Sequence, residues 1–197
     1  PAYRATDRLR EFGREYEMTF FDSIKRIDEI LAGEKPVQEK RGILLPLLAD
    51  ADLLRNFFAK LDRPEWVEFL LEKGFFEQPP ELIQKESGVA HPFWPAGEYL
   101  VRMAPLAPDE VFRAFEHVDT QNARVIRNIA EASLHMSGPK AAVLSEKILK
   151  ALRSKNAWPM IYQDETAKLA AKLANSNELN AAIDLADTLF FFQRAPG

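Results

Sequence analysis

The chain of 197 residues contains no cysteine. This absence excludes a disulfide framework and any metal site with thiolate ligands, and it removes cysteine as a catalytic nucleophile. A chain without cysteine suits a reducing compartment, so we expect a cytoplasmic protein. Its first residue is proline and not methionine, so we also expect a fragment of a longer protein.

Long apolar runs are missing as well. The best candidate, GILLPLL from Gly42, has seven residues and is interrupted by proline, whereas a bilayer-spanning helix needs roughly 18. No basic segment followed by an apolar one begins the chain, so we expect no secretory signal. These absences predict a protein that does not interact with membranes.

Histidine and glycine are scarce, which restricts the available chemistry. The three histidines, His91, His117 and His135, have no partner at a helical i,i+4 spacing, so no zinc ligand pair is preset. The eight glycines are scattered singly and form no phosphate-binding loop. No serine lies in a strand–turn–helix elbow. We therefore expect no catalytic residue, no metal and no cofactor, and predict that the chain is not an enzyme.

The chain is rich in apolar residues at helical spacing. Hydrophobic residues make up 47% of it, and the net charge is only −4, so no bulk charge points to a polyanionic partner. From Thr6 the apolar positions recur every three or four residues, which predicts one long helix that ends near Gly33. This stripe consists of Leu9, Phe12, Tyr16, Phe20, Ile24, Ile27 and Leu31.

The same spacing predicts helices along most of the remaining chain. Gly74 is expected to end one of them in a left-handed conformation, and Asp62 to cap its start. No alternation of period two is present, so we predict an all-α protein of about nine helices and no β-sheet. The expected helices lie at about 36–49, from Asp50 or Asp52 to Leu61, and at 62–73, 95–103, 109–118, 123–136, 139–154, 163–175 and 178–192.

A proline-rich segment at 77–95 separates the earlier helices from the later ones. Its prolines restrict themselves and the residues before them, so we expect an ordered, extended loop. They are Pro79, Pro80, Pro92 and Pro95.

The string HPFWP at the end of this loop allows two interpretations. Phe93 and Trp94 could offer a stacking platform to a base or an aromatic ligand, with His91 as the polar contact. Alternatively they anchor the loop in the core, and Pro95 begins the next helix in its first turn. We favour the second interpretation.

The six helices at 96–192 can be laid over one another as three helix hairpins. Short connections and small residues at close contacts favour a stack of antiparallel hairpins over a plain helix bundle, which remains the alternative. The small residues are Ala130, Ala132, Ala170, Ala171 and Ala174. We therefore predict one helical-repeat domain over 1–197, with N-terminal helices at 1–76, the loop at 77–95 and three hairpins at 96–192.

The paired helices at 37–192 resemble those of HEAT-like and armadillo-like α-solenoids. The string PEWVEFLLEKGFF, followed by HPFWP and YLVRMAPLAP, is similar to helical-repeat segments of large bacterial multidomain proteins. The resemblance implies a scaffold or sensing arm attached to another domain, and it implies no catalytic residue.

One region differs in charge from its surroundings. Between Asn122 and Lys155 seven basic residues stand against two acidic ones, Glu131 and Glu146. A band of this kind can bind nucleic-acid phosphates or an acidic protein surface, but it also occurs as an ordinary solvated face. The candidate contacts are Arg124, Arg127, Lys140, Lys147, Lys150 and Arg153.

The last predicted helix is apolar around most of its circumference. Its final apolar side chains cover about 300° of the helix, whereas the end helix of a small stack buries only its inner face, so some rings should be exposed. Phe190, Phe191 and Phe192 are therefore a candidate docking surface. The next repeat, a following domain or a second copy could cover it, and we expect weak self-association.

These observations favour a non-catalytic helical-repeat module that holds a protein partner or an adjoining domain of the same polypeptide. A nucleic-acid-binding repeat that uses the basic residues is the alternative. A hydrolase or glycosylase built on such repeats comes third, because no arrangement of acid, base or nucleophile can be named.

Overall fold

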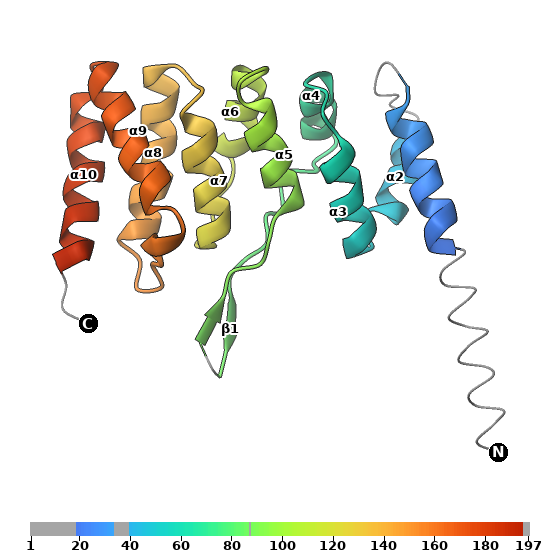
Figure 1. The fold of residues 1–197 in the computed structure, drawn as a ribbon, viewed down its shortest axis with the longest axis horizontal. Helices are drawn as coiled ribbons and strands as arrows, with labels where there is room; N and C mark the ends of the chain where they lie inside the picture. The colour runs from blue at the N-terminus through green and yellow to red at the C-terminus, as the bar shows by residue number, and fades with distance from the viewer. Residues whose placement is uncertain (1–18, 34–39, 87, 195–197) are drawn as a thin grey trace. The chain divides into compact units, whose positions relative to one another are not determined.

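The computed structural model describes residues 19–33, 40–86 and 88–194 (Figure 1). Most of these residues are helical, as the spacing of the apolar residues predicts. The described part also contains one two-stranded sheet, which corrects the prediction of a protein without a β-sheet. The chain divides into two compact units, Pro1–Leu61 and Asp62–Gly197, and each is described separately.

The first unit contains three helices among its described residues. Residues 19–31 form one of them, and α2 (Arg41–Leu47) and α3 (Ala51–Lys60) follow. This confirms the C-terminal half of the first predicted helix. Its first part, at 6–18, and residues 36–39 of the second predicted helix lie outside the described residues.

The start of α3 shows how the sequence sets a helix boundary. The Asp50 carboxylate accepts hydrogen bonds from the N–H groups of Asp52 and Leu53, at 2.9 and 3.0 Å. Of the two predicted caps, Asp50 is therefore the one in use. The helix then buries its apolar face, which includes Leu53, Phe57 and Phe58.

The second unit contains seven α-helices among its described residues. The helices expected after residue 95 are all present, and their ends differ from the predicted ones by only a few residues. A short 3-10 helix, Pro159–Ile161, precedes α9. The bounds are α4 (Glu65–Glu72), α5 (Pro95–Met103), α6 (Pro108–Glu116), α7 (Ala123–Ser133), α8 (Gly138–Leu152), α9 (Gln163–Asn175) and α10 (Leu179–Arg194).

The helices of this unit stand in two rows (Figure 1). The helices α5, α7 and α9 contact one another in turn, and α4, α6, α8 and α10 form the other row. Each helix also contacts its neighbour in sequence across the rows from α5 onward. The core lies between the rows and contains Val111, Phe115, Ile126, Ile129, Leu144, Ile148, Leu169 and Leu185.

Proline begins three of these helices. Pro95, Pro108 and Pro139 stand in the first turn of α5, α6 and α8. Proline fits there because the first turn of a helix leaves its N–H groups without partners in the helix. The prediction for Pro95 is confirmed.

The end of α4 is as predicted and its start is not. Gly74 has a φ of +76°, and the N–H groups of Phe75 and Gly74 donate to the carbonyl oxygens of Leu70 and Leu71, both at 3.0 Å. This pair of bonds is the Schellman ending. At the other end, Pro64 occupies the cap position and no side chain caps the helix, so the predicted cap by Asp62 is wrong.

The sheet lies inside the segment that was predicted to be a loop. Strands β1 (Ile83–Lys85) and β2 (Gly88–Ala90) pair antiparallel, with Ile83 opposite Ala90. They project beyond the ends of the helices (Figure 1). Each strand has three residues and neither is buried, so the apolar alternation that reveals a half-buried strand is absent from the sequence.

One buried side chain holds both sides of this hairpin to the helices. Asn122, fully buried at the start of α7, donates from its Nδ2 to the carbonyl oxygens of Pro80 and Pro92, at 2.8 and 2.9 Å. Its Oδ1 accepts from the N–H of Arg124 at 3.0 Å and so caps α7. The three bonds satisfy the amide and fix the base of the hairpin.

The HPFWP string serves mainly as a core anchor. Trp94 is only 4% exposed and meets the Phe115 ring edge to face, with centroids 6.1 Å apart. Nδ1 of the buried His91 accepts from the N–H of Ala123 at 2.9 Å. The core interpretation is therefore confirmed for Trp94. It is wrong for Phe93, whose side chain is 43% exposed.

Candidate interaction surface

The helices α9 and α10 form the last hairpin of the second unit. They are joined by a tight turn in which Asn177 has a φ of +64° and the N–H of Glu178 donates to the carbonyl of Leu173 at 2.9 Å. Thr166 and Leu169 of α9 and Leu185 of α10 face the core and are fully buried. This pairing leaves the opposite side of both helices without a neighbouring helix among the described residues.

A groove runs along that opposite side, and we call it the α9–α10 groove. Its volume is about 530 Å³. All of its described lining residues are apolar, which is typical of surfaces that bind an apolar partner. They are Ala167, Ala170, Ala171, Ala174, Leu179, Ala182, Ile183, Ala186, Leu189 and Phe190.

The groove has a smooth wall and a ridged wall. The α9 wall consists only of alanines, whereas α10 contributes the large side chains. Leu179, Ile183 and Phe190 are 53, 56 and 51% exposed. Positions 179, 183, 186 and 190 are spaced by four, three and four residues and so lie on one face of α10. The three large side chains therefore form one row along α10, with the small Ala186 between Ile183 and Phe190.

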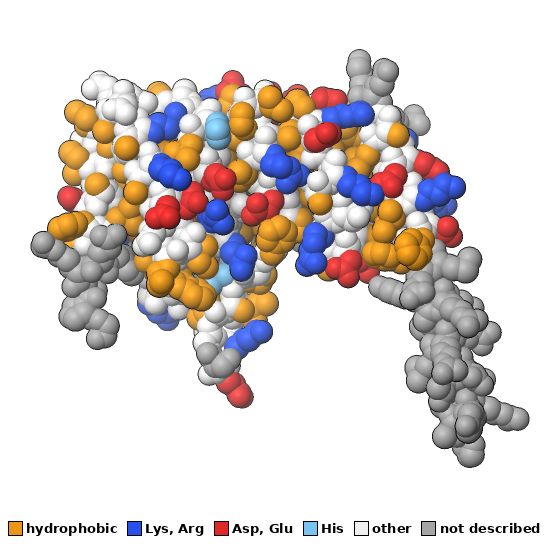
Figure 2. Space-filling view, viewed as in Figure 1, with side chains coloured by type: hydrophobic (Ala, Val, Ile, Leu, Met, Phe, Trp, Pro, Cys, Tyr) orange, Lys and Arg blue, Asp and Glu red, His pale blue; other side chains and the backbone are white. Residues whose placement is uncertain are grey.

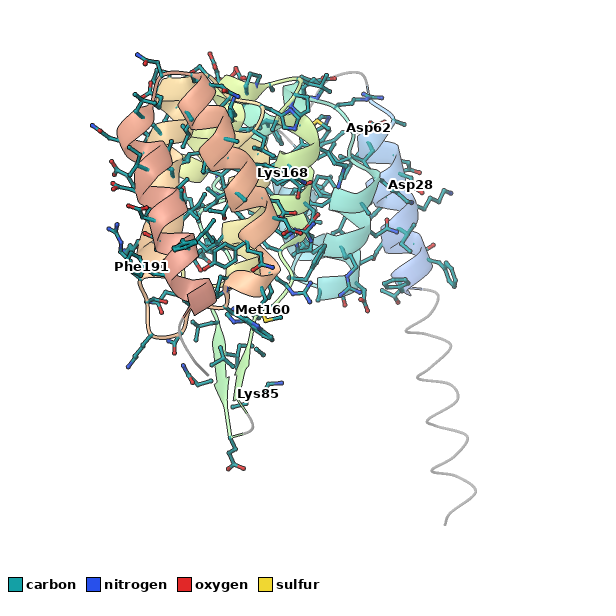
Figure 3. The ribbon with its side chains drawn as sticks, turned by 60° about the vertical axis from the view of Figure 1, so that its left-hand side comes forward. Asp28, Asp62, Lys85, Met160, Lys168 and Phe191 are labelled. Carbon is teal, nitrogen blue, oxygen red and sulfur yellow. The ribbon has the colours of Figure 1, made fainter. Side chains whose placement is uncertain are left out.

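The phenylalanines of the predicted docking surface lie on different sides of α10. Phe190 lines the groove. Phe191 is 73% exposed and lies on the side of α10 that faces away from α9 (Figure 3). The expected exposure of the terminal rings is confirmed for these two, while the side chain of Phe192 lies outside the described residues.

Four of the six predicted basic contacts are bound to neighbouring helices or to the loops between them. Nζ of Lys140 lies 2.6 Å from Oδ1 of Asp109, and Nζ of Lys150 lies 2.7 Å from Asp119. Nε of Arg127 lies 3.2 Å from Oε1 of Glu165. These pairs join α8 to α6 and its following loop, and α7 to α9.

The fourth of these side chains, Lys147, points inward. Its Nζ donates to the carbonyl of Val118 at 2.7 Å, and burial lowers its pKa. The hydrogen bond from Lys150 lowers the pKa of Asp119. Lys147 and Lys150 thus connect α8 to the segment that follows α6.

The other two basic residues, Arg124 and Arg153, are exposed and make no ion pair with a residue that the structure describes. These two residues alone do not form a continuous basic surface. On the face of the second unit in Figure 2, basic and acidic side chains are interspersed. A phosphate backbone needs several basic side chains along one track.

A second exposed apolar group lies near the base of the hairpin. Trp158 is 46% and Met160 76% exposed, and the Trp158 ring lies 5.3 Å from that of His91. Met160 lies between α9 and the hairpin, which carries Lys85 (Figure 3). Burial, followed by the charge of Arg124, lowers the pKa of His91, so its Nδ1 can accept the Ala123 hydrogen bond at neutral pH.

The side chains suited to metal binding do not converge within the described residues. No group of three or more His, Asp or Glu in this part of the chain could hold a metal ion. Across 19–33, 40–86 and 88–194, none of the helices combines the length and the apolar character of a bilayer-spanning segment.

Comparison with known proteins identifies no relative of the chain. No family model matches the chain, and no curated protein and no solved structure matches it either. Function therefore has to be inferred from the geometry of the surfaces.

The sequence predicted exposed rings on the last helix, but it did not predict the groove beside them. Ala171 and Ala174 were expected at close contacts within the stack, but they are exposed in the groove. Ala130 and Ala132, in α7, are fully buried as expected, and Ala170 of α9 is buried as well, at 9% exposed. The row of alanines looks the same in both sequences. It indicates a face that another helix can approach closely, but it does not indicate whether such a helix is present.

Proposed function

We propose that the chain is a helical-repeat module of the α-solenoid type, HEAT-like in its hairpins, that binds a protein partner and carries out no chemistry itself. The two rows of helices support the repeat architecture, because helices two apart in sequence contact one another from α4 to α10. In a solenoid each hairpin contacts only its neighbours, so the last hairpin has a free apolar face unless a further unit covers it.

The α9–α10 groove is the single observation that carries the proposal. Its described lining is wholly apolar, and three large side chains in it are about half exposed. Isolated exposed apolar residues are ordinary, but a continuous patch on an end unit is typical of a protein interface. A helical partner suits the groove, because a helix can pack its side chains into the groove between the side chains of α9 and those of α10.

The nucleic-acid alternative has less support. Of the six candidate basic side chains, only those of Arg124 and Arg153 form no ion pair or hydrogen bond with another described group. Binding of duplex DNA or RNA at low salt, lost steeply as salt is added, would restore this alternative.

Binding of the fluorescent apolar probe bis-ANS tests the groove. We expect the folded chain to bind it and the Ile183→Glu variant to lose most of this binding, because a carboxylate in the groove opposes an apolar ligand. The matched control is Val143→Glu, since Val143 of α8 is 45% exposed and lies outside the groove. Equal loss in both variants, or no binding to the folded chain, would contradict the proposal.

A further inference from the structure

The two walls of the α9–α10 groove are complementary in shape to each other. One wall is a row of alanines and the other is the ridge of Leu179, Ile183 and Phe190. If two such hairpins meet face to face about a two-fold axis parallel to their helices, the ridge of each copy lies on the alanine wall of the other. A two-fold contact requires this kind of self-complementary surface.

The positions of the large and small residues along the helix axes agree with this two-fold contact. Helical residues rise by 1.5 Å each, so residues equally far from the turn at 176–178 lie at about the same level on α9 and α10. Leu179 is then level with Ala174, and Ile183 with Ala171. A two-fold axis parallel to the helices preserves these levels, so Leu179 and Ile183 each meet an alanine, whereas Phe190 extends past the alanine wall to the level of Gln163 and Asp164.

The charges at the edges of the groove are complementary as well. Lys168 lies on the edge of α9 away from α10 (Figure 3), and helical spacing places Asp187 on the edge of α10 away from α9. Both are exposed, and they stand at nearly the same distance in sequence from the turn. The two-fold axis exchanges the edges and brings Lys168 of each copy opposite Asp187 of the other.

No charge has to be buried in this contact, because the described lining contains none. A buried unpaired charge would cost more than the contact gains. At the level nearest the turn, the exposed Asn175 and Asn180 occupy the two edges, where their amides can pair across the axis.

From these observations we infer that the partner of the α9–α10 groove is a second copy of this chain, packed hairpin to hairpin about a two-fold axis parallel to α9 and α10. This inference rests on the proposed function, since it names the partner of the same groove. A contact limited to one hairpin from each copy is small, so the dimer should be weak and depend on concentration.

Sedimentation equilibrium of the 197-residue chain over a range of concentrations tests the dimer. We expect a reversible monomer–dimer equilibrium, monomeric behaviour of Ile183→Glu and an unchanged equilibrium for the control Val143→Glu. Circular dichroism checks that both variants keep their helices. A strict monomer at all concentrations, with bis-ANS binding retained, would overturn the inference and leave the proposed function in place.

A charge exchange tests the two-fold geometry. Lys168→Asp and Asp187→Lys each place like charges opposite each other at both edges, so each should weaken the dimer by about tenfold at low ionic strength. A mixture of the two variants restores both opposite-charge pairs and should form a heterodimer as readily as the original chain forms its dimer. A mixture that associates no better than its components would overturn the two-fold arrangement.

Discussion

The helices α7 and α9 are neighbours in one row, yet they are buried to very different extents. Eight of the eleven residues of α7 are buried, but only four of the thirteen of α9 are. Both contain several alanines, so their composition does not explain the difference. The cause is position, because α7 has α5 on one side and α9 on the other, whereas α9 has a described row neighbour on one side only.

The helices α7 and α9 also differ in where their polar side chains lie. Asn128 of α7 is 1% exposed, and its Nδ2 donates to Oε1 of Glu98 on α5 at 3.0 Å. This bond satisfies the amide donor where water cannot reach it, whereas the buried Oδ1 of Asn128 has no hydrogen-bond partner among the described residues. The groove side of α9 instead carries only alanines, and its polar residues lie at the edges. Between α5 and α7 this polar side chain links two helices, whereas on the groove side of α9 the polar residues border an apolar surface.

The largest effect is expected for the ring that anchors α5 in the stack. Trp94→Ala should lower the free energy of unfolding by about 3–5 kcal/mol, because it empties a site that is closed by Phe115. Phe93→Ala is the matched control and should cost much less, since Phe93 is 43% exposed. Urea unfolding measures both, and an unchanged midpoint for Trp94→Ala would show that the ring is not part of the core.

Substitutions at two isoleucines compare the buried helix α7 with the exposed face of α10. Ile129 of α7 is fully buried, whereas Ile183 of α10 is 56% exposed. Ile129→Ala should cost about 2–5 kcal/mol, and Ile183→Ala about 0.5 kcal/mol or less in the monomer. Urea unfolding at low protein concentration gives both values. Similar costs would mean that the face of α10 is covered in the monomer.

A close approach of α5 and α7 should make Gly97 intolerant of a methyl group. A Cβ added at Gly97 would lie 2.5 Å from Oδ1 of Asn128 and 2.5 Å from Cε3 of Trp94. Gly97→Ala should therefore destabilise by about 1–3 kcal/mol, although alanine is otherwise the better helix former.

Gly42→Ala in α2 is the control for this substitution, because a Cβ there has no neighbour within 4 Å. It should stabilise slightly through the helix propensity of alanine alone. If thermal unfolding shows that the two alanine variants behave alike, the helices are not in close contact at Gly97.

The smallest effect is a pH dependence at the base of the hairpin. The pKa of His91 in the folded chain lies below its ordinary value of 6.5, first because of burial and then because of Arg124. The unfolded chain therefore binds the proton more readily. The stability that depends on neutral His91 is fully present above pH 6.5 and is lost as the pH falls through the lower, folded pKa.

Unfolding in urea on either side of pH 6.5 measures this loss, and His91→Gln is its control. Glutamine has a side-chain oxygen that can accept from Ala123, and it does not titrate. The variant should lose the part of the pH dependence that His91 causes. An equal slope in both proteins would show that another group is responsible.

Several elements could be predicted from the sequence because their causes are local. The six helices from residue 95 onward follow from apolar spacing, and the end of α4 follows from Gly74, which takes the left-handed conformation at low cost. The prediction failed at Asp62, because the chain does not enter the helix until Pro64. It also failed for the hairpin, whose strands are short, are not buried and depend on Asn122 from a distant part of the chain.

Taken alone, the sequence determined where most helices form and which side of each one is apolar, since both depend on residues a few positions apart. Only the tertiary structure decided which apolar sides are covered. The alanines of α7 have a helix packed against them and are buried, whereas Ala167, Ala171 and Ala174 of α9 have the same local properties but border an open groove and are exposed. Likewise the sequence predicts Lys140, Lys147 and Lys150 as candidate contacts, and only the fold shows that each of them is bonded to a neighbouring helix or loop.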